Sequence, residues 1–518
     1  MIRAATDVFT TPKLDYALIT PMLVVFVGAM IGILVEAFTS RSVRRVVQPV
    51  LGFVTLLVAF VVLVVVTRPK AGVIGTEGTV AMDTAGVYLQ AAIILLSLVA
   101  FLLFVERRID SAGDPFTASA ATIPGSEDER ELTAAGVLST EVWPLALFSV
   151  GGMMLFVVAN DFLSMFVALE VMSLPLYLLV GLARRRRLLS QEAALKYFLL
   201  GAFSSAFFLF GSALLFGFSG SLNFSDLAAA LGARVGLDPL LLVGTAMVGV
   251  GLLFKVGAVP FHSWVPDVYQ GAPTPLTSFM ASAVKIAAFG AMIRVFYVGL
   301  GDYRWDWRPF MWAVAAVTMI VASVVAITQT DIKRMLAYSS VAQVGFIMVG
   351  FVATNKAGLS GMLFYLAAYG IATIGAFAVV MLVRDAGGEA THLSKWAGLG
   401  RKSPVVAAVL GLFLLSFAGI PLTSGFTAKF AVFSAAVSGG STSLAVVGVI
   451  MSAVAAFFYI RVIVLMFFSD PADDGPTVAL PSPLTSVALV VAVVLTIALG
   501  VFPQPLLQLA QDAAVLVR

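Results

Sequence analysis

Four charged side chains lie deep inside apolar segments of this sequence. Glu170 stands about eight residues into one segment, and Lys255, Lys285 and Lys429 each lie within another. A charge near the centre of a bilayer costs about 2.5–3.5 kcal/mol on insertion scales, so such residues normally face a bundle interior or water. A lysine amine changes its protonation readily when desolvated, whereas an arginine stays charged. The pattern predicts proton transfer between buried groups, with Glu170 paired to a lysine.

Two of these lysines stand beside helix-breaking residues. Lys255 precedes Pro260 by five residues, with Gly257 between them, and Lys429 follows Pro421 by eight. Interrupted helices expose carbonyl and N–H groups, and such groups recur where ions cross membranes. One broken helix with one lysine in each half of the chain suggests an internal repeat.

Other titratable residues in or near the apolar runs allow two interpretations. Lys196 lies near the start of its helix, where it either joins the proton path or extends toward the membrane surface. His262 follows the first break and either relays protons near neutral pH or packs through a hydrogen bond. Arg294 and Arg461 lie within reach of helix ends, and His392 lies in a loop. We expect structural roles for these last three.

The composition excludes a soluble or disordered protein. The 518 residues are 60% hydrophobic and 11% charged, whereas a soluble domain is about 25% charged. Continuous apolar runs, without the alternation of a β-barrel, predict an all-α polytopic membrane protein. The sequence has no cysteine, which excludes iron–sulfur clusters and cysteine-ligated zinc. It also has no glycine-rich nucleotide-binding motif, so we expect no cofactor in this chain.

About fourteen apolar runs are long enough to cross a membrane, since a core about 30 Å thick needs roughly 20 residues per helix. The run 404–437 is too long for one span and contains Gly419, Pro421 and Gly425, so we expect a broken helix there. The polar stretch 106–140 is predicted to be a partly disordered cytoplasmic loop. The runs are 14–38, 46–67, 85–105, 142–159, 162–182, 192–219, 239–259, 274–299, 309–329, 332–353, 358–383, 404–437, 440–468 and 484–510.

Basic residues in the loops predict the orientation. The loops at one end carry 16 Lys and Arg residues, including four arginines at 184–187, and the end that includes both termini carries nine. The positive-inside rule places the first end in the cytoplasm and both termini outside. Residues 1–15 carry charges of both signs without a small-residue cleavage site, so we expect no signal peptide.

Four segments of the sequence resemble a known family, the antiporter-like membrane subunits of respiratory complex I (NADH–quinone oxidoreductase). The stretches 192–205 and 266–275 are most similar to subunit N, and the resemblance is strong over about residues 140–470. The segments are Leu169-Glu-Val-Met-Ser-Leu-Pro-Leu-Tyr-Leu178, Phe254-Lys-Val-Gly-Ala-Val-Pro-Phe-His-Ser-Trp-Val-Pro-Asp-Val-Tyr-Gln-Gly-Ala-Pro-Thr-Pro275, Asp331-Ile-Lys-Arg-Met-Leu-Ala-Tyr-Ser-Ser340 and Gly419-Ile-Pro-Leu-Thr-Ser-Gly-Phe-Thr-Ala-Lys-Phe430.

The resemblance implies two inverted five-helix repeats in which helices 7 and 12 are interrupted. It implies that Glu170 of helix 5 pairs with Lys255 of helix 7. It further implies that Lys285 of helix 8 links two half-channels and that Lys429 of helix 12 belongs to the outward one. Lys196 matches a lysine of helix 6.

The expected geometry is one row of groups near mid-membrane. We expect Glu170 and Lys255 on facing helices, about 4–7 Å apart, with Lys285 in the middle of the row and Lys429 at its far end. Neighbouring lysines would be about 7–12 Å apart, bridged by waters at about 2.8 Å per hydrogen bond. His262 is expected beside the first gap and Gln343 near the path. Relatives often carry a histidine at the place of Gln343, and glutamine can hold water but takes up no proton.

The resemblance also implies the place of the chain in an assembly. It divides the sequence into three N-terminal helices with an acidic loop (1–140), two repeats (141–300 and 301–470) and a last helix (471–518). It implies a proton-translocating, non-redox subunit of a bacterial inner-membrane NADH:quinone oxidoreductase, a translocase, beside other antiporter-like and small membrane subunits and without nucleic acid. FMN, iron–sulfur clusters, NADH and quinone would belong to other subunits.

Two alternatives remain at this point. The first is a subunit of a multi-subunit cation/proton antiporter or of a membrane hydrogenase, which would share the charged residues. The stretch 269–275 favours complex I, and the identity of the neighbouring genes would decide between these assemblies. The second is a membrane scaffold with charges left from an ancestor, and it predicts that neutralising the buried lysines leaves proton pumping intact.

The predicted orientation can be tested by labelling. A cysteine introduced at Arg186 in this cysteine-free chain should react with a membrane-impermeant thiol reagent only from the cytoplasmic side. Labelling of intact cells from outside would overturn the orientation, and a cysteine at Lys356, in a loop of the opposite end, provides the matched control.

Overall fold

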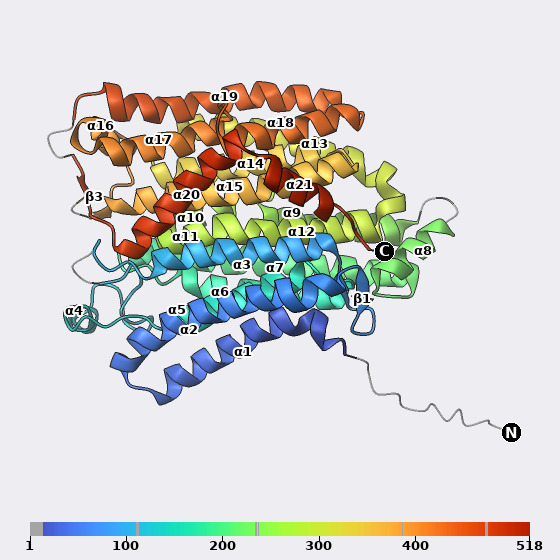
Figure 1. Ribbon diagram of the computed structural model, residues 1–518, viewed down its shortest axis with the longest axis horizontal. Helices are drawn as coiled ribbons and strands as arrows, with labels where there is room; N and C mark the ends of the chain where they lie inside the picture. The colour runs from blue at the N-terminus through green and yellow to red at the C-terminus, as the bar shows by residue number, and fades with distance from the viewer. Residues whose placement is uncertain are drawn as a thin grey trace.

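The computed structural model describes residues 14–109, 113–233, 236, 238–385, 387–471 and 475–517. Long helices lie side by side in one bundle and run between the same two ends of the molecule (Figure 1). Within the described residues, twelve helical segments are long and apolar enough to cross a membrane, and α5 and α17 are shorter apolar helices. The predicted all-α polytopic membrane fold is confirmed, and each predicted run overlaps one of these segments.

The membrane helices follow the predicted order along the chain. Those up to the end of the helix that carries Lys285 are α1 (Tyr16–Phe38), α2 (Arg41–Val62), α3 (Thr84–Phe104), α5 (Val142–Phe156), α6 (Phe162–Val180), α7 (Arg187–Ser219), α9 (Pro239–Val256), α10 (Trp264–Gly271), α11 (Thr274–Phe279), η3 (Met280–Val284), α12 (Lys285–Ile293) and η4 (Arg294–Gly299). The later ones are α13 (Arg304–Thr328), α14 (Ile332–Val352), α15 (Lys356–Leu382), α17 (Pro404–Ala418), α18 (Ser424–Ser438), α19 (Thr442–Phe468), α20 (Pro483–Val501) and α21 (Gln504–Ala513).

Short elements close the two ends of the bundle. The hairpin of β1 (Val73–Gly75) and β2 (Val80–Met82) precedes α3, and α8 (Phe224–Gly232) follows α7. At the other end, β3 (Val383–Asp385) pairs with β4 (Gly388–Glu389) and with β5 (Thr477–Val478), which ties the segment after α15 to the segment before α20. The helices α4 (Glu127–Ala134) and α16 (Leu399–Lys402) also lie at that end (Figure 1).

The core of the bundle is the helix at 274–299 together with α14 and α15. In the most apolar 18-residue stretch of 274–299 every residue is buried. In the most apolar 18-residue stretch of α20 only 22% of the residues are buried. The helix that carries Lys285 is therefore enclosed by protein. It contains two π-helical turns, η3 directly before Lys285 and η4 from Arg294 onward, and such turns are frequent at functional sites.

The two predicted helix breaks are confirmed, and they share one geometry. Gly257 ends α9 with φ +81°, and Gly419 ends α17 with φ +85°. In each case the glycine N–H and the next N–H donate to the same carbonyl, that of Leu253 or that of Leu415, at 2.9–3.1 Å. This left-handed cap closes a helix without further hydrogen bonding. The pair α9 and α10 runs opposite to α17 and α18 (Figure 1), as inverted repeats require.

A buried ion pair joins helix ends that lie far apart in the sequence. Arg294 donates through Nη2 and Nη1 to the two carboxylate oxygens of Asp83, at 2.6 and 2.7 Å, and both side chains are 1% exposed. Its Nε donates to the Val157 carbonyl, and Asp83 also accepts from the Val517 N–H at 3.0 Å. Because this bidentate pair satisfies a buried guanidinium, the structural role expected of Arg294 agrees with its contacts.

The structure corrects two expectations. The loop 106–140 was predicted to be partly disordered, but its described residues are held in place: Asp114 pairs with Arg184 at 2.9 Å, and Glu129 pairs with Arg187 at 2.8 Å. The run 484–510 was predicted as one helix, but α20 ends at Val501 and α21 starts at Gln504. Proline at position 503 has no N–H to continue the helix.

The basic loops and the chain ends lie at opposite ends of the bundle. The loops with α4, β3 and α16 are at one end, and α8, β1 and the C-terminal segment are at the other (Figure 1). Four of the nine basic residues assigned to the second end lie outside the described residues, namely Arg3, Lys13, Arg234 and Arg518. The grouping predicted from the sequence matches this arrangement, and the side that faces the cytoplasm stays a prediction.

Breaking the buried ion pair should destabilise the bundle. Asp83→Asn removes the charge that balances Arg294, and losing one partner of a buried pair costs about 3–5 kcal/mol. The variant should unfold at a lower temperature in detergent. The matched control is Arg461→Gln, whose exposed guanidinium donates to the Ile327 carbonyl and whose loss should change stability by less than about 0.5 kcal/mol. Equal melting temperatures for Asp83→Asn and the unmodified protein would contradict this role.

Candidate functional site

Lys255 lies at the first helix break. It occupies the last turn of α9, one residue before the break begins, and is 4% exposed. Its Nζ donates to Ser173 Oγ of α6 at 2.6 Å and lies 3.4 Å from the Tyr197 hydroxyl of α7. Both neighbours are hydroxyl groups, which can donate or accept. The surroundings of Lys255 therefore suit both a charged and a neutral amine.

Glu170 lies on α6, one turn before Ser173. Among the described residues no ion pair joins Glu170 directly to Lys255: the Lys255 Nζ donates to Ser173 Oγ, and Glu170 Oε1 is buried without a hydrogen-bond partner. The separation of about 4–7 Å expected for such a pair stays a prediction.

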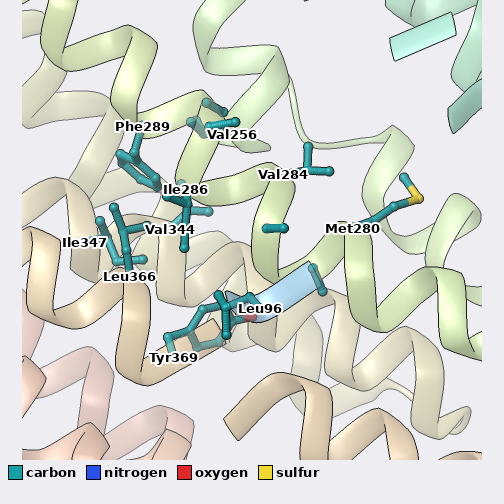
Figure 2. Close-up of a cluster of buried hydrophobic side chains, with 14 of the residues drawn as sticks. Leu96, Val256, Met280, Val284, Ile286, Phe289, Val344, Ile347, Leu366 and Tyr369 are labelled. Atoms are coloured by element: carbon teal, nitrogen blue, oxygen red, sulfur yellow. The ribbon is translucent and has the colours of Figure 1, made fainter. Parts of the chain in front are cut away.

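Lys285 occupies the centre of the bundle. It is 3% exposed, and its Nζ donates to the backbone carbonyl of Ser340 in α14 at 3.2 Å. Many buried apolar side chains pack around this part of the helix. Figure 2 shows the buried cluster to which Ile286, Val344 and Leu366 belong. A charged amine here has one carbonyl partner from the protein, so water or a neighbouring group must provide the rest of its hydrogen bonding.

Lys429 lies at the second break and has three acceptors. Its Nζ donates to the carbonyls of Phe417 and Ala418 at 2.8 and 3.0 Å, and to Ser452 Oγ at 2.8 Å. It also stands 4.5 Å from the centre of the Phe346 ring. The two carbonyls belong to the last turn of α17, where no further helical N–H is available for them. The broken helix thus provides the negative end of a dipole for the ammonium.

Gln343 shares an acceptor with Lys429. It is 1% exposed on α14, and its Nε2 donates to the Phe417 carbonyl at 3.0 Å, the same oxygen that accepts from Lys429. Its Oε1 accepts from Tyr365, and its Nε2 also contacts Tyr459 at 3.2 Å. Among the described residues no hydrogen bond joins Gln343 to Lys285, and its place near a proton path stays a prediction.

Lys196 and His262 lie apart from these contacts. The Lys196 side chain is 43% exposed and pairs with Glu192 at 2.7 Å and Asp267 at 2.8 Å. His262 is half-buried in the first break, with its ring edge-on to Tyr338 and no hydrogen-bond partner on Nδ1 among the described residues. Lys196 therefore sits in a surface ion-pair cluster, and the expected place of His262 beside the first gap stays a prediction.

The polar side chains that surround the lysines were not predicted from the sequence. Ser173, Tyr197, Ser452 and Tyr459 all contact a lysine or Gln343. Ser173 could have been found, because it follows Glu170 by three residues and so shares its helix face. The others come from helices whose contacts only the tertiary packing reveals. Within the described residues, no group of three or more His, Asp or Glu side chains could hold a metal ion.

Comparison with known proteins identifies the family. Residues 159–455, more than half of the chain, match the family described as NADH:quinone oxidoreductase/Mrp antiporter, TM. The chain belongs to this family. It is 57% identical to NADH-quinone oxidoreductase subunit N of Rhodococcus opacus, over 100% of this chain and 99% of that one. It is 53% identical to subunit N of Mycobacterium tuberculosis, over 99% of this chain and 100% of that one. The resemblance to subunit N is confirmed.

Solved structures agree on the fold. A chain of respiratory complex I from Thermus thermophilus with bound aureothin is 30% identical, with a TM-score of 0.75 over 95% of this chain and 99% of that one. A chain of the Mrp complex from Dietzia is 22% identical, with a TM-score of 0.79 over 97% of both. The second likeness concerns the fold alone, whereas the identity to subunit N extends over the whole chain.

The contact between Gln343 and the Phe417 carbonyl should matter for proton transfer. Gln343→Leu removes the amide between α14 and the second break and leaves buried polar groups unpaired, which costs about 1–3 kcal/mol. We expect the assembled complex to move fewer protons per NADH oxidised, measured in proteoliposomes. Gln329→Leu is the matched control, because its amide contacts only α13 residues. An unchanged proton yield in Gln343→Leu would argue against a role in the path.

Proposed function

We propose that this chain carries protons across the membrane as subunit N of a NADH–quinone oxidoreductase, through Lys255, Lys285 and Lys429. The supporting observation is the set of contacts around Lys285 and Lys429, which both involve α14. Lys285 donates to a carbonyl of α14, and Gln343 of the same helix shares the Phe417 carbonyl with Lys429. Relatives that are 57% identical over the full chain carry the subunit N name, which favours this assembly over a cation/proton antiporter.

Glu170 is the group that controls the first lysine in this proposal. Two unit charges about 7 Å apart interact by about 2.4 kcal/mol at an effective dielectric of 20. A change of that size shifts a protonation equilibrium by more than tenfold. Moving, neutralising or hydrating Glu170 would therefore let Lys255 release its proton. The hydroxyls of Ser173 and Tyr197 remain good partners for the neutral amine that is left.

Lys429 behaves differently because its partners favour the charged form. An ammonium has three donors, and here they meet two carbonyls and one hydroxyl. A neutral amine could still donate to both carbonyls and accept from the Ser452 hydroxyl, but the carbonyl dipoles aimed at Nζ stabilise the positive charge of the ammonium more strongly. We infer that Lys429 holds its proton until a new charge approaches along the row, and then passes it onward. Gln343 would orient water in the gap before it.

The chain would contribute no redox chemistry. In this proposal electrons pass from NADH to quinone in other subunits, which hold FMN and iron–sulfur clusters, and the subunit acts as part of a proton translocase. It would lie in the bacterial inner membrane with the basic loops in the cytoplasm, in contact with other membrane subunits. The two repeats at 141–300 and 301–470 would each contribute one broken helix.

Substitution of Lys285 tests the central step. Lys285→Ala should abolish proton pumping by the assembled complex, while quinone reduction persists in part. Lys285→Arg should also stop pumping, because a guanidinium keeps the charge but gives up no proton. Normal proton yield per NADH in both variants would exclude Lys285 from the path and favour a scaffold. Lys356→Ala, an exposed lysine at the start of α15, is the matched control and should pump normally.

A further inference from the structure

The last two helices cross the bundle obliquely and meet beside the second break. α20 begins at the end of the bundle that carries β3, and α21 returns toward the opposite end (Figure 1). The chain changes direction between them, because α20 ends at Val501 and Pro503 has no N–H to continue the helix. We refer to α20 and α21 together as the C-terminal helix pair.

Both ends of the C-terminal helix pair are bonded to α3. Before α20, the Ser482 N–H donates to Oε2 of Glu106, just past the end of α3, at 2.8 Å. After α21, the Val517 N–H donates to Oδ2 of Asp83, the residue that caps the start of α3, at 3.0 Å. Both carboxylates are buried. Hydrogen bonds to a charged acceptor are strong, so the helix pair is fixed at both ends of the bundle.

The middle of the helix pair contacts the backbone of the second break. A Cβ added to Gly500, in the last turn of α20, would lie 2.4 Å from the carbonyl oxygen of Leu422 and 2.5 Å from the carbonyl carbon of Thr423. These are backbone atoms, which cannot rotate away as the end of a side chain can. Small residues allow two backbones to approach this closely, so the contact requires glycine at position 500.

The contact falls on a strained part of the connection between α17 and α18. Leu422 has φ +70°, in the left-handed region. This conformation is unfavourable for leucine and persists where the surrounding structure holds it. Because the Leu422 carbonyl lies against Gly500, α20 is part of the structure that holds it.

The position of this connection determines the geometry around Lys429. Lys429 belongs to α18, whereas two of its acceptors, the carbonyls of Phe417 and Ala418, belong to α17. A shift of Leu422 and Thr423 therefore moves the start of α18 relative to the end of α17. Hydrogen bonds of 2.8 and 3.0 Å allow little displacement before they weaken.

We propose that the C-terminal helix pair is a strap that holds the second break closed around Lys429, with Gly500 as a positioning residue. The inference rests on the proposed role of Lys429 in proton transfer. Gly500 has no side chain and acts through the position of Leu422. The strap also covers irregular backbone, which is tolerated at membrane depth only where protein or a water-filled cavity surrounds it.

Gly500→Ala in the assembled complex tests the strap. The added methyl group must displace Leu422, so we expect fewer protons moved per NADH in proteoliposomes, toward the yield of Lys429→Ala, while quinone reduction persists. Hydrogen–deuterium exchange of a peptide covering 419–426 should become faster, because the connection is no longer held. Gly411→Ala on α17 is the matched control. Its added Cβ would meet a ring carbon of Phe467 at an ordinary 4.0 Å, so both measurements should stay unchanged.

A second variant loosens the strap without adding bulk. Glu106→Ala removes the acceptor of the Ser482 N–H, about 27 Å from Gly500 along α20 at 1.5 Å per residue. It should change the exchange at 419–426 and the proton yield in the same direction as Gly500→Ala, and it decides the test if Gly500→Ala does not assemble.

The two measurements separate the possible failures. Unchanged exchange at 419–426 would overturn the strap, and faster exchange with a normal proton yield would overturn the positioning of Lys429. A normal proton yield in Lys429→Ala would instead contradict the proposed function, and the positioning role with it, whatever the exchange in Gly500→Ala.

Discussion

A lysine ammonium inside a bilayer must find hydrogen-bond acceptors in the protein or in bound water, and the second broken helix provides two of them for Lys429. Most carbonyls inside a continuous helix already accept a helical N–H, whereas those of the last turn do not. Ending α17 at Gly419 releases the carbonyls of Phe417 and Ala418, and both accept from Lys429. The left-handed glycine makes this possible, because it closes the helix with little strain and without a side chain. A Cβ on Gly419 would come within 2.9 Å of the Lys429 side chain.

The two breaks share a backbone geometry but differ in the groups that donate hydrogen bonds to the carbonyls at the end of the helix. At the first break the carbonyl of Phe254 accepts from the indole N–H of Trp264 at 2.9 Å, and Lys255 turns to hydroxyl groups of neighbouring helices instead. At the second break Lys429 itself donates hydrogen bonds to the free carbonyls. In the proposed path, the hydroxyl partners would suit either form of Lys255, whereas the carbonyl dipoles would favour the charged form of Lys429. Such a difference would give proton transfer along the row a direction.

The sequence predicted the parts of this arrangement that local chemistry determines. The length of the apolar runs predicted the membrane helices. Both helix breaks were predicted from glycine and proline, because these residues change the backbone conformation at their own positions; they are Gly257, Pro260, Gly419 and Pro421. The partners of the lysines were not predictable in the same way, since Ser452 and Tyr459 reach the row only through packing of helices far apart in the chain. The buried charges in the apolar runs indicated the candidate lysines, but neither they nor the resemblance to complex I subunits showed that Ser173 would accept a hydrogen bond from Lys255. The ordered loop around Arg184 and Arg187 was missed because acidic composition alone says nothing about a buried basic partner.

The two partners of the Asp83–Arg294 ion pair are synthesised at different times. The two residues are 211 positions apart, and a ribosome adds about 5–20 residues per second, so the carboxylate precedes its guanidinium by about 10–40 s. The Val517 N–H, which binds the same carboxylate, comes 434 positions after it. During synthesis Asp83 must therefore stay in contact with water or with an insertion factor, although in the finished bundle it is 1% exposed. The bundle can close around this end only after the helix at 274–299 has entered the membrane, which sets an order for its assembly.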